Sequence, residues 1–368
     1  MATSDKLSRM SDTPYSSQPP KAFWRTGVAD AGIWGYESLF RSKWKLPANA
    51  AFATYGSCFA QHISRAVQAN GKPWVNAEPA PASASPALAA KFGYGVYSSR
   101  TANIYTARML ELWVALARTP ALCDTIEIWE DDQGRFRDSL RPAIEPDGFE
   151  TRETCLEMLR ATARAFGRSA REAQVFVFTM GLTEGFEHAE TGQPYALCPG
   201  TLAGTYDAAR HRFVNYRYPA ILKSMRTAIR GLRKLNPELK FLLTVSPVPL
   251  TATATDHHVL LATQYSKSVL RAVAGDLAEM AADIDYFPSY EIIASPPTRA
   301  QFFAPNMRSV APEGVALVME HFFRGMRFSK KTLAGNATEA SRRSAIKAEA
   351  AAEDLACEEI LLDQGASS

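Results

Sequence analysis

Apolar and polar positions follow two patterns along the chain, one typical of buried strands and one typical of helices. Short strand-type runs lie at 52–55, 175–178, 241–245 and 284–287, and the run at 175–178 is continuously apolar, as in a strand covered on both faces. Stretches with an apolar residue every three or four positions predict helices at 104–118, from 151 onward, and at 221–235, 259–282 and 313–323. Repeated strand–helix units predict an α/β fold, a three-layer doubly wound sandwich with a mainly parallel sheet.

The strand–helix units and the stretches that flank them predict a single domain over residues 23–328, between a leader and a tail. Residues 1–22 are rich in Ser and Pro without periodicity, which predicts a disordered leader. Phe23 to Leu46 holds Trp24, Trp34 and Trp44, and we expect it to wrap over the core as a cover. Runs at 126–129 and 136–138 predict a small hairpin. Residues 329–368 are rich in Ala, Glu, Lys and Arg, which predicts a polar helical or disordered tail.

The turn after the first strand combines a hydroxyl with a thiol. The run that starts at Phe52 breaks at Gly56, and a helical pattern follows that ends at Asn70. Ser57 and Cys58 therefore lie where a strand becomes a helix, and the unpaired N–H groups of a helix start favour negative charge. A cysteine in such a place is more readily the nucleophilic thiolate, although a cysteine that only packs as a small apolar residue fits the same position.

Polar residues also follow two other predicted strands. Residues 181–184 come directly after the run at 175–178, and Ser246 follows the run at 241–245. Parallel sheets bind ligands beyond the carboxyl ends of their strands. The sequence therefore predicts that these residues and Ser57–Cys58 form one site.

Composition narrows the partners and the compartment. The 368 residues carry a net charge of only +3 and no dense Lys/Arg run, which argues against a nucleic-acid partner. The five cysteines are odd in number and show neither CxxC nor Cys/His spacing, so we expect no disulfide framework and no metal. No stretch approaches the roughly 18 apolar residues of a membrane helix. We therefore expect a soluble, cytoplasmic protein without a membrane span.

The sequence of the turn, Gly56-Ser-Cys-Phe-Ala60, resembles the signature of the GSCFA family, which is similar to the SGNH (GDSL-type) hydrolases. Similar stretches lie at 103–108, 179–184, 198–200, 245–252, 258–272 and 285–291. The resemblance implies an SGNH- or flavodoxin-like fold and relatives linked to bacterial polysaccharide biosynthesis.

The resemblance also assigns roles to individual residues. Cys58 occupies the nucleophile position, and Ser57 serves instead if the turn is shifted by one residue. Gly181-Leu-Thr-Glu184 resembles the Gly-x-Asn-Asp block of the oxyanion hole, with Thr183 where an amide is usual. Asn103 is the best remaining amide donor, preceded by Ala102 where the family has glycine. The alternative for Asn103 is a cap for the helix that follows.

The sequence departs from the SGNH pattern at the general base. The Asp-x-x-His block corresponds to Asn306 through Ser309, so both of its members are replaced. His258 is the best substitute, and His62 is an alternative because it lies one helical turn from Cys58. The remaining assignments are Glu184 and Asp256 to orient the base, and Ser246 and Lys267 to bind substrate, Lys267 through a phosphate or carboxylate.

The resemblance, together with the residues that carry it, implies an acyl-transfer enzyme, a carbohydrate O-acyltransferase or esterase. The substrate is expected to be a small molecule or a glycan, with acyl-CoA as a possible donor and no required cofactor. The alternative is a catalytically degenerate SGNH-like protein that binds CoA or a glycan precursor, because Asn306 and Ser309 replace the acid and base. A redox-sensing cysteine is a third reading of the same thiol.

Overall fold

A four-stranded parallel sheet forms the centre of the computed structural model, which describes residues 13–36 and 38–329. In spatial order its strands are β10 (Ile284–Phe287), β9 (Lys240–Val245), β5 (Val175–Met180) and β2 (Phe52–Gly56). A single parallel bridge joins Phe52 to Trp74 on the outer side of β2. The chain thus runs first from β2 outward to Trp74 and then back across β2 to β5, so the strand order reverses at β2. The predicted parallel α/β sheet is confirmed.

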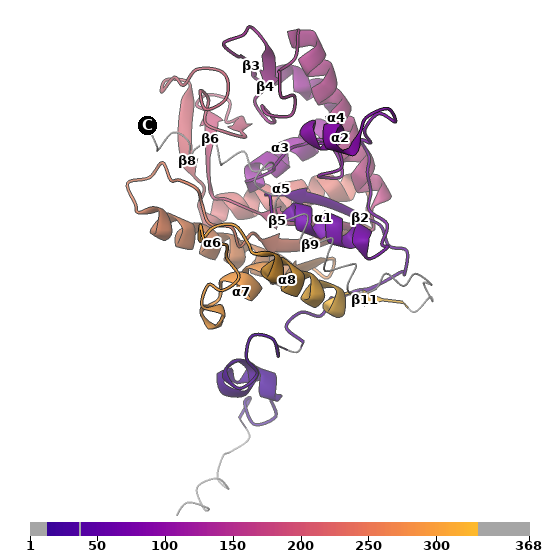
Figure 1. Ribbon diagram of the computed structural model, residues 1–368, viewed down its shortest axis with the longest axis vertical. Helices are drawn as coiled ribbons and strands as arrows, with labels where there is room; N and C mark the ends of the chain where they lie inside the picture. The colour runs from indigo at the N-terminus through magenta and orange to yellow at the C-terminus, as the bar shows by residue number, and fades with distance from the viewer. Residues whose placement is uncertain (1–12, 37, 330–368) are drawn as a thin grey trace, which may run out of the picture.

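Helices cover both faces of this sheet because neighbouring strand residues point to opposite sides. Phe176 belongs to one apolar cluster and Val177 to the other. The cluster around Phe176 includes residues of α3 (Ala107–Arg118), α4 (Arg152–Glu172), α5 (Tyr218–Leu235) and α6 (Val259–Met280). The cluster around Val177 includes residues of α1 (Ala60–Ala69), α7 (Ser289–Ala294) and α8 (Pro312–Gly325), and Figure 1 shows α7 and α8 across the sheet from α3 and α5.

Smaller elements complete the body. The predicted hairpin is confirmed as β3 (Ile128–Glu130) and β4 (Phe136–Asp138). An antiparallel sheet that the sequence did not predict consists of β7 (Pro194–Tyr195), β6 (Glu184–His188) and β8 (His211–Asn215). It lies beyond the carboxyl end of β5, because only three residues separate β5 from β6 (Figure 1). Other short elements include β1 (Lys45–Leu46), which pairs with β11 (Arg327–Phe328), and α2 (Pro86–Lys91).

Hydroxyl side chains set where two of the helices begin. Thr151 accepts a hydrogen bond from Thr154 N at the start of α4, as predicted. Thr106 accepts one from Met109 N and begins α3 three residues later than predicted. Asn103 is therefore not the cap of α3, and that alternative is wrong.

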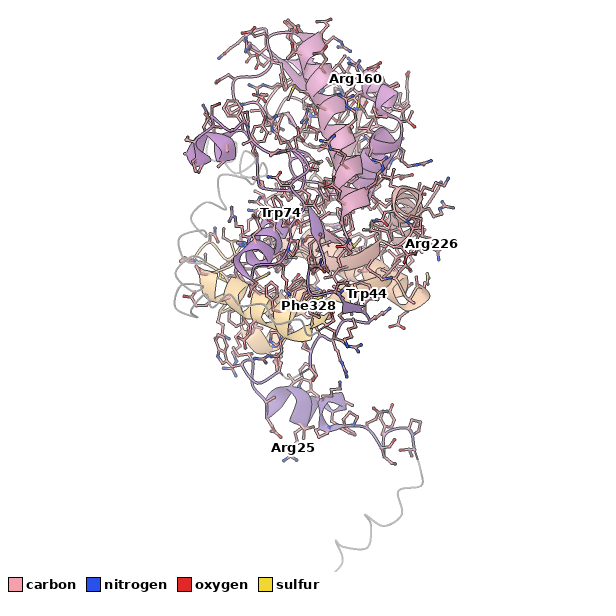
Figure 2. The ribbon with its side chains drawn as sticks, turned by 90° about the vertical axis from the view of Figure 1, so that its right-hand side faces the viewer. Arg25, Trp44, Trp74, Arg160, Arg226 and Phe328 are labelled. Atoms are coloured by element: carbon pink, nitrogen blue, oxygen red, sulfur yellow. The ribbon has the colours of Figure 1, made fainter. Side chains whose placement is uncertain are left out.

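The expectation that Phe23 to Leu46 covers the core is correct only for its second half. Trp44 is buried, and its Nε1 donates to Ala282 O at 2.6 Å. Trp24 and Trp34 are 68% and 65% exposed, although the edge of the Trp34 ring contacts Phe302. Figure 2 shows Arg25 on a segment that projects from the body, whereas Trp44 lies within it.

Some expectations fall outside the described residues, namely most of the predicted leader (1–12) and nearly all of the predicted tail (330–368). Within the described ranges, no helix is both long and apolar enough to cross a membrane.

Candidate functional site

Gly56 allows β2 and β5 to approach closely at the end of β2. Its φ of +134° lies in a region that favours glycine, and a Cβ there would come within 2.3 Å of Thr179 O. The next amide, Ser57 N, donates to Thr179 O at 3.0 Å. Ser57 and Cys58 thus follow the carboxyl end of β2, where the strand order reverses and parallel sheets bind ligands.

The Ser57 side chain packs directly against the α-carbon of Gly181. A Cβ at position 181 would lie 2.9 Å from Ser57 Cβ and 3.5 Å from Ser57 Oγ. Ser57 is 3% exposed, and its hydroxyl has no hydrogen-bond partner among the residues that the structure describes. An unpaired buried polar group costs about 1–3 kcal/mol, so a hydroxyl in this state points to a functional use.

A chain of hydrogen bonds orients Asn103 beside this contact. Gln61 Nε2 donates to Tyr97 OH at 3.4 Å, and Tyr97 OH donates to Asn103 Oδ1. Tyr97 OH also lies 3.3 Å from Ser57 O, and Ile104 N donates to Gly56 O at 2.9 Å. Because Oδ1 accepts from Tyr97, the NH₂ group of Asn103 is the end that faces away from Tyr97 and donates.

Two residues of α6 hold the loop that contains Gly181 and Thr183. Lys267 Nζ donates to Gly181 O at 2.7 Å, and Ser266 Oγ accepts from Thr183 N at 3.1 Å. Lys267 is 1% exposed, so it lies beneath the loop and not on a solvated helix face. The Thr183 hydroxyl is buried and has no hydrogen-bond partner within the described ranges.

The amide of Gly181 is already used inside the protein. Gly181 N and Leu182 N donate to Tyr105 O at 3.2 and 3.0 Å. Gly181 therefore contributes close approach to Ser57, and its own amide does not serve as an oxyanion donor.

Cys58 lies at the start of α1 in apolar surroundings. It is 4% exposed and belongs to the cluster that includes Val248, Phe302 and Val310. His62, one helical turn further along, is also buried, and its ring lies 5.2 Å from that of Phe59. Both side chains thus lie inside the protein near the end of β2.

The structure places His258 at the surface, where it caps α6. Its Nδ1 accepts from Leu260 N at 3.1 Å, and its side chain is exposed. The neighbouring Asp256 is exposed as well. The two replaced residues of the acid–base block, Asn306 and Ser309, bond to each other in an exposed turn.

Glu184 faces a cavity and is held by the loop after β9. Its carboxylate accepts from Thr253 Oγ1 at 2.8 Å and from Ala254 N at 3.4 Å. Burial raises the pKa of Glu184, whereas the bond from Thr253 and the charge of His257 act to lower it. His257 is therefore the histidine with an electrostatic influence on Glu184, and the sequence had not assigned it that role.

Ser246 follows β9 beside the same edge of the sheet. Its N–H donates to Met180 O at 2.9 Å, and its buried Oγ accepts from Val248 N at 3.3 Å. It thus ties the end of β9 to the end of β5.

A cavity of about 360 Å³ lies between α3, the β6–β8 sheet and the 250–254 loop. Leu182, Glu184 and Thr253 form part of its wall. A larger hollow of about 620 Å³ lies between α5 and α6, but Ile284 at the amino end of β10 lines it. That hollow is therefore at the opposite end of the sheet from Ser57.

Taken together, Ser57, Gly181 and Lys267 form one connected group, and Asn103 and Thr183 join it through hydrogen bonds. Glu184 faces the neighbouring cavity, and His258 stands apart at the surface. Sequence reasoning missed Gln61, Tyr97 and Ser266, because such residues carry no recognisable spacing. No cluster of three or more His, Cys, Asp or Glu side chains that could hold a metal occurs among the described residues.

Comparison with known proteins gives one match. A family model described as the GSCFA family matches residues 51–322, which include all of the site residues above. No curated protein and no solved structure matches the chain.

Proposed function

Because the chain belongs to the GSCFA family, we propose that it is an acyl-transfer enzyme built on an SGNH-like scaffold. The proposed reaction is that of a carbohydrate O-acyltransferase or esterase, with a glycan or small-molecule acceptor and acyl-CoA as a donor. Support for the scaffold comes from the strand order, in which β2 lies between the Trp74 segment and β5. That is the 2-1-3-4-5 order of flavodoxin-like sheets, which bind ligands between the first and third strands.

The observation that carries the proposal is the contact between Ser57 and Gly181. It joins the turn that resembles the nucleophile block to the loop that resembles the oxyanion block, at the point where the strand order reverses. The buried, unpaired hydroxyls of Ser57 and Thr183 lie on these two segments. A site that receives a ligand oxygen explains why they have no partner among the residues that the structure describes.

In the proposed reaction the Cys58 thiolate attacks the acyl carbonyl carbon. A carbon–sulfur bond forms, the bond to the leaving group breaks, and the leaving group takes up a proton. A hydroxyl of the acceptor, or water, then attacks the thioester, loses its proton and releases the Cys58 thiol. The start of α1 favours the thiolate, against the opposing effect of the apolar surroundings of Cys58. Ser57 is the alternative nucleophile on the same turn, and its attack follows the same course through an ester.

Negative charge develops on the carbonyl oxygen at each step. Asn103 and Thr183 are the proposed donors, through the NH₂ group that Tyr97 orients and through a hydroxyl with no other acceptor in the described part of the chain. Donors fixed in advance stabilise such an oxyanion by about 3–4 kcal/mol each.

We assign proton transfer to His62 and not to His258. His62 is buried one helical turn from Cys58. His258 is exposed, and its Nδ1 already accepts the capping hydrogen bond from Leu260 N at the start of α6. The assignment follows the alternative that the sequence left open for His62.

The test is ester turnover by single variants of the full chain. We expect Cys58→Ala to lower the hydrolysis of p-nitrophenyl acetate by at least about 100-fold, as for other nucleophiles. Cys123→Ala is the matched control, because Cys123 is a buried thiol on the opposite face of the sheet. Unchanged turnover in Cys58→Ala and in Ser57→Ala would eliminate the nucleophile assignment.

A second candidate function is a binding protein that has lost catalysis. The turn closed by Asn306 and Ser309, together with the capping role of His258, favours it, because neither an acid nor a base is supplied from those positions. Calorimetric titration with coenzyme A and with nucleotide-sugars separates the two functions. Tight binding without turnover supports the binding protein, and turnover excludes it.

A further inference from the structure

The cavity beside the site is lined mainly by apolar side chains. Its volume is about 360 Å³, near the lower end of the 300–1,000 Å³ typical of small-molecule pockets. Apolar walls come from five separate segments, and they include Met109, Leu182, Phe186, Leu197, Phe213 and Leu250. The size and lining favour a compact apolar group over a bulky sugar or nucleotide.

The cavity and the Ser57 contact share one piece of backbone. Tyr105 O accepts from both Gly181 N and Leu182 N, so these residues are fixed together. Gly181 packs against Ser57, whereas Leu182 and Tyr105 line the cavity. The Ser57 contact and the cavity wall therefore lie on adjacent residues of one fixed backbone segment.

The polar groups of the cavity do not call for a charged ligand. Glu184 already accepts hydrogen bonds from Thr253 and Ala254, so its carboxylate is satisfied inside the protein. A free carboxylate on the ligand would meet this negative charge at short range and be repelled. An ammonium group is not required to neutralise it.

We propose that this cavity binds the acyl chain of the substrate, as a neutral aliphatic chain of medium length near eight carbons. The inference rests on the proposed acyl transfer and specifies its substrate class. It places the acyl carbonyl at the turn and the chain end against Phe186 and Phe213.

Cys198 offers a direct readout, because its half-buried thiol lines the cavity. Burial raises the pKa of Cys198 to about 11, so labelling is carried out at about pH 9 with excess iodoacetamide. Octanamide is the probe, since it is neutral and its amide is a poor acyl donor. We expect octanamide to slow the alkylation of Cys198 at least about fivefold, measured by peptide mass spectrometry, and acetamide at the same concentration to have no effect.

Variants that fill the cavity test the location. Ala196→Phe and Cys198→Phe place a ring where the chain would lie, and each is expected to abolish octanamide binding in calorimetry. The matched control is Ala209→Phe, at an exposed position that does not line the cavity. Thermal unfolding of each variant shows whether it is folded, and the labelling of the unmodified chain decides the question if neither cavity variant folds.

The outcomes separate this inference from the proposed function. Protection of Cys198 by octanamide without turnover of any ester supports the cavity assignment and contradicts acyl transfer. Turnover of esters with Cys198 labelling unaffected by octanamide overturns the cavity assignment and leaves acyl transfer standing.

Discussion

Ser57 and Gly181 are 124 positions apart in the chain, yet a Cβ added at Gly181 would meet Ser57 Cβ at 2.9 Å. The contact exists because β2 and β5 are parallel neighbours that end at the same edge of the sheet. It brings the only two segments that resemble the nucleophile and oxyanion blocks into direct contact, and the site depends on glycine at position 181.

Replacing this glycine should damage the site specifically. In Gly181→Ala the new methyl group meets Ser57 Cβ at 2.9 Å and Tyr105 O at 3.2 Å, so backbone must shift. We expect a loss of about 1–3 kcal/mol in unfolding free energy and at least about a tenfold loss of ester turnover. Gly275→Ala is the control, because the atom it meets is the end of the flexible Arg271 side chain and alanine favours the helix. Equal activity in the two variants would show that the contact is not needed.

Removing the support of Thr183 should destabilise the loop. Ser266→Ala leaves the buried Thr183 N–H without its acceptor, at a cost of about 1–3 kcal/mol in urea unfolding. Ser268→Ala lies two residues further along the same helix but is exposed, and we expect a change within about 0.5 kcal/mol. A cost in Ser266→Ala no larger than in Ser268→Ala would contradict the role given to Ser266.

Ala102 occupies a backbone conformation that favours glycine. Its φ of +55° is left-handed, which costs about 1–2 kcal/mol for a residue with a Cβ. Glycine is more flexible in the unfolded chain, which offsets about 0.4–1 kcal/mol. We therefore expect Ala102→Gly to raise the free energy of unfolding by about 0.5–1 kcal/mol. The control, Ala161→Gly within α4, should lower it by about 1 kcal/mol, and destabilisation by both would refute the strain at Ala102.

The lowered pKa of His321 predicts that the stability of the protein depends on pH. Burial, and secondarily Arg324, lowers its pKa below the ordinary value of 6.5, whereas Glu320 acts to raise it. Because the unfolded chain then binds more protons than the folded one, stability is lost as pH falls below about 6.5. We expect His321→Gln to lose less stability than the wild type between about pH 7.5 and 5.5, measured by urea unfolding. Parallel pH profiles would contradict the prediction.

The strands and long helices could be predicted because the local pattern of apolar residues indicates which positions are buried. The run at 175–178 is apolar without interruption, since β5 is covered on both faces, and 259–282 shows a helical period over most of α6. The meeting of Ser57 with the 181–184 loop followed from the parallel arrangement alone. These features depend on neighbours in sequence and on one rule of sheet geometry.

What could not be predicted depends on distant packing. β6 and β8 carry polar residues such as half-exposed His188 and exposed Arg212, so no alternation marks them as strands. The burial of Lys267 and the Tyr97–Asn103 bond arise only when α6 and the 97–103 loop reach the same edge of the sheet. The apolar cluster to which Cys58 belongs likewise draws in residues far along the chain, such as Val248 and Val310.

The most direct measurement is to locate the acyl group on the enzyme. The full chain is incubated with p-nitrophenyl acetate, quenched in acid within seconds, and digested for peptide mass spectrometry. The account predicts an acetyl group on the Ser57–Cys58 turn, on the Cys58 sulfur, which accumulates further in His62→Ala because deacylation is slowed. Hydrolysis of the ester with the turn unmodified in both proteins, or an acetyl group that accumulates on another residue, would contradict it.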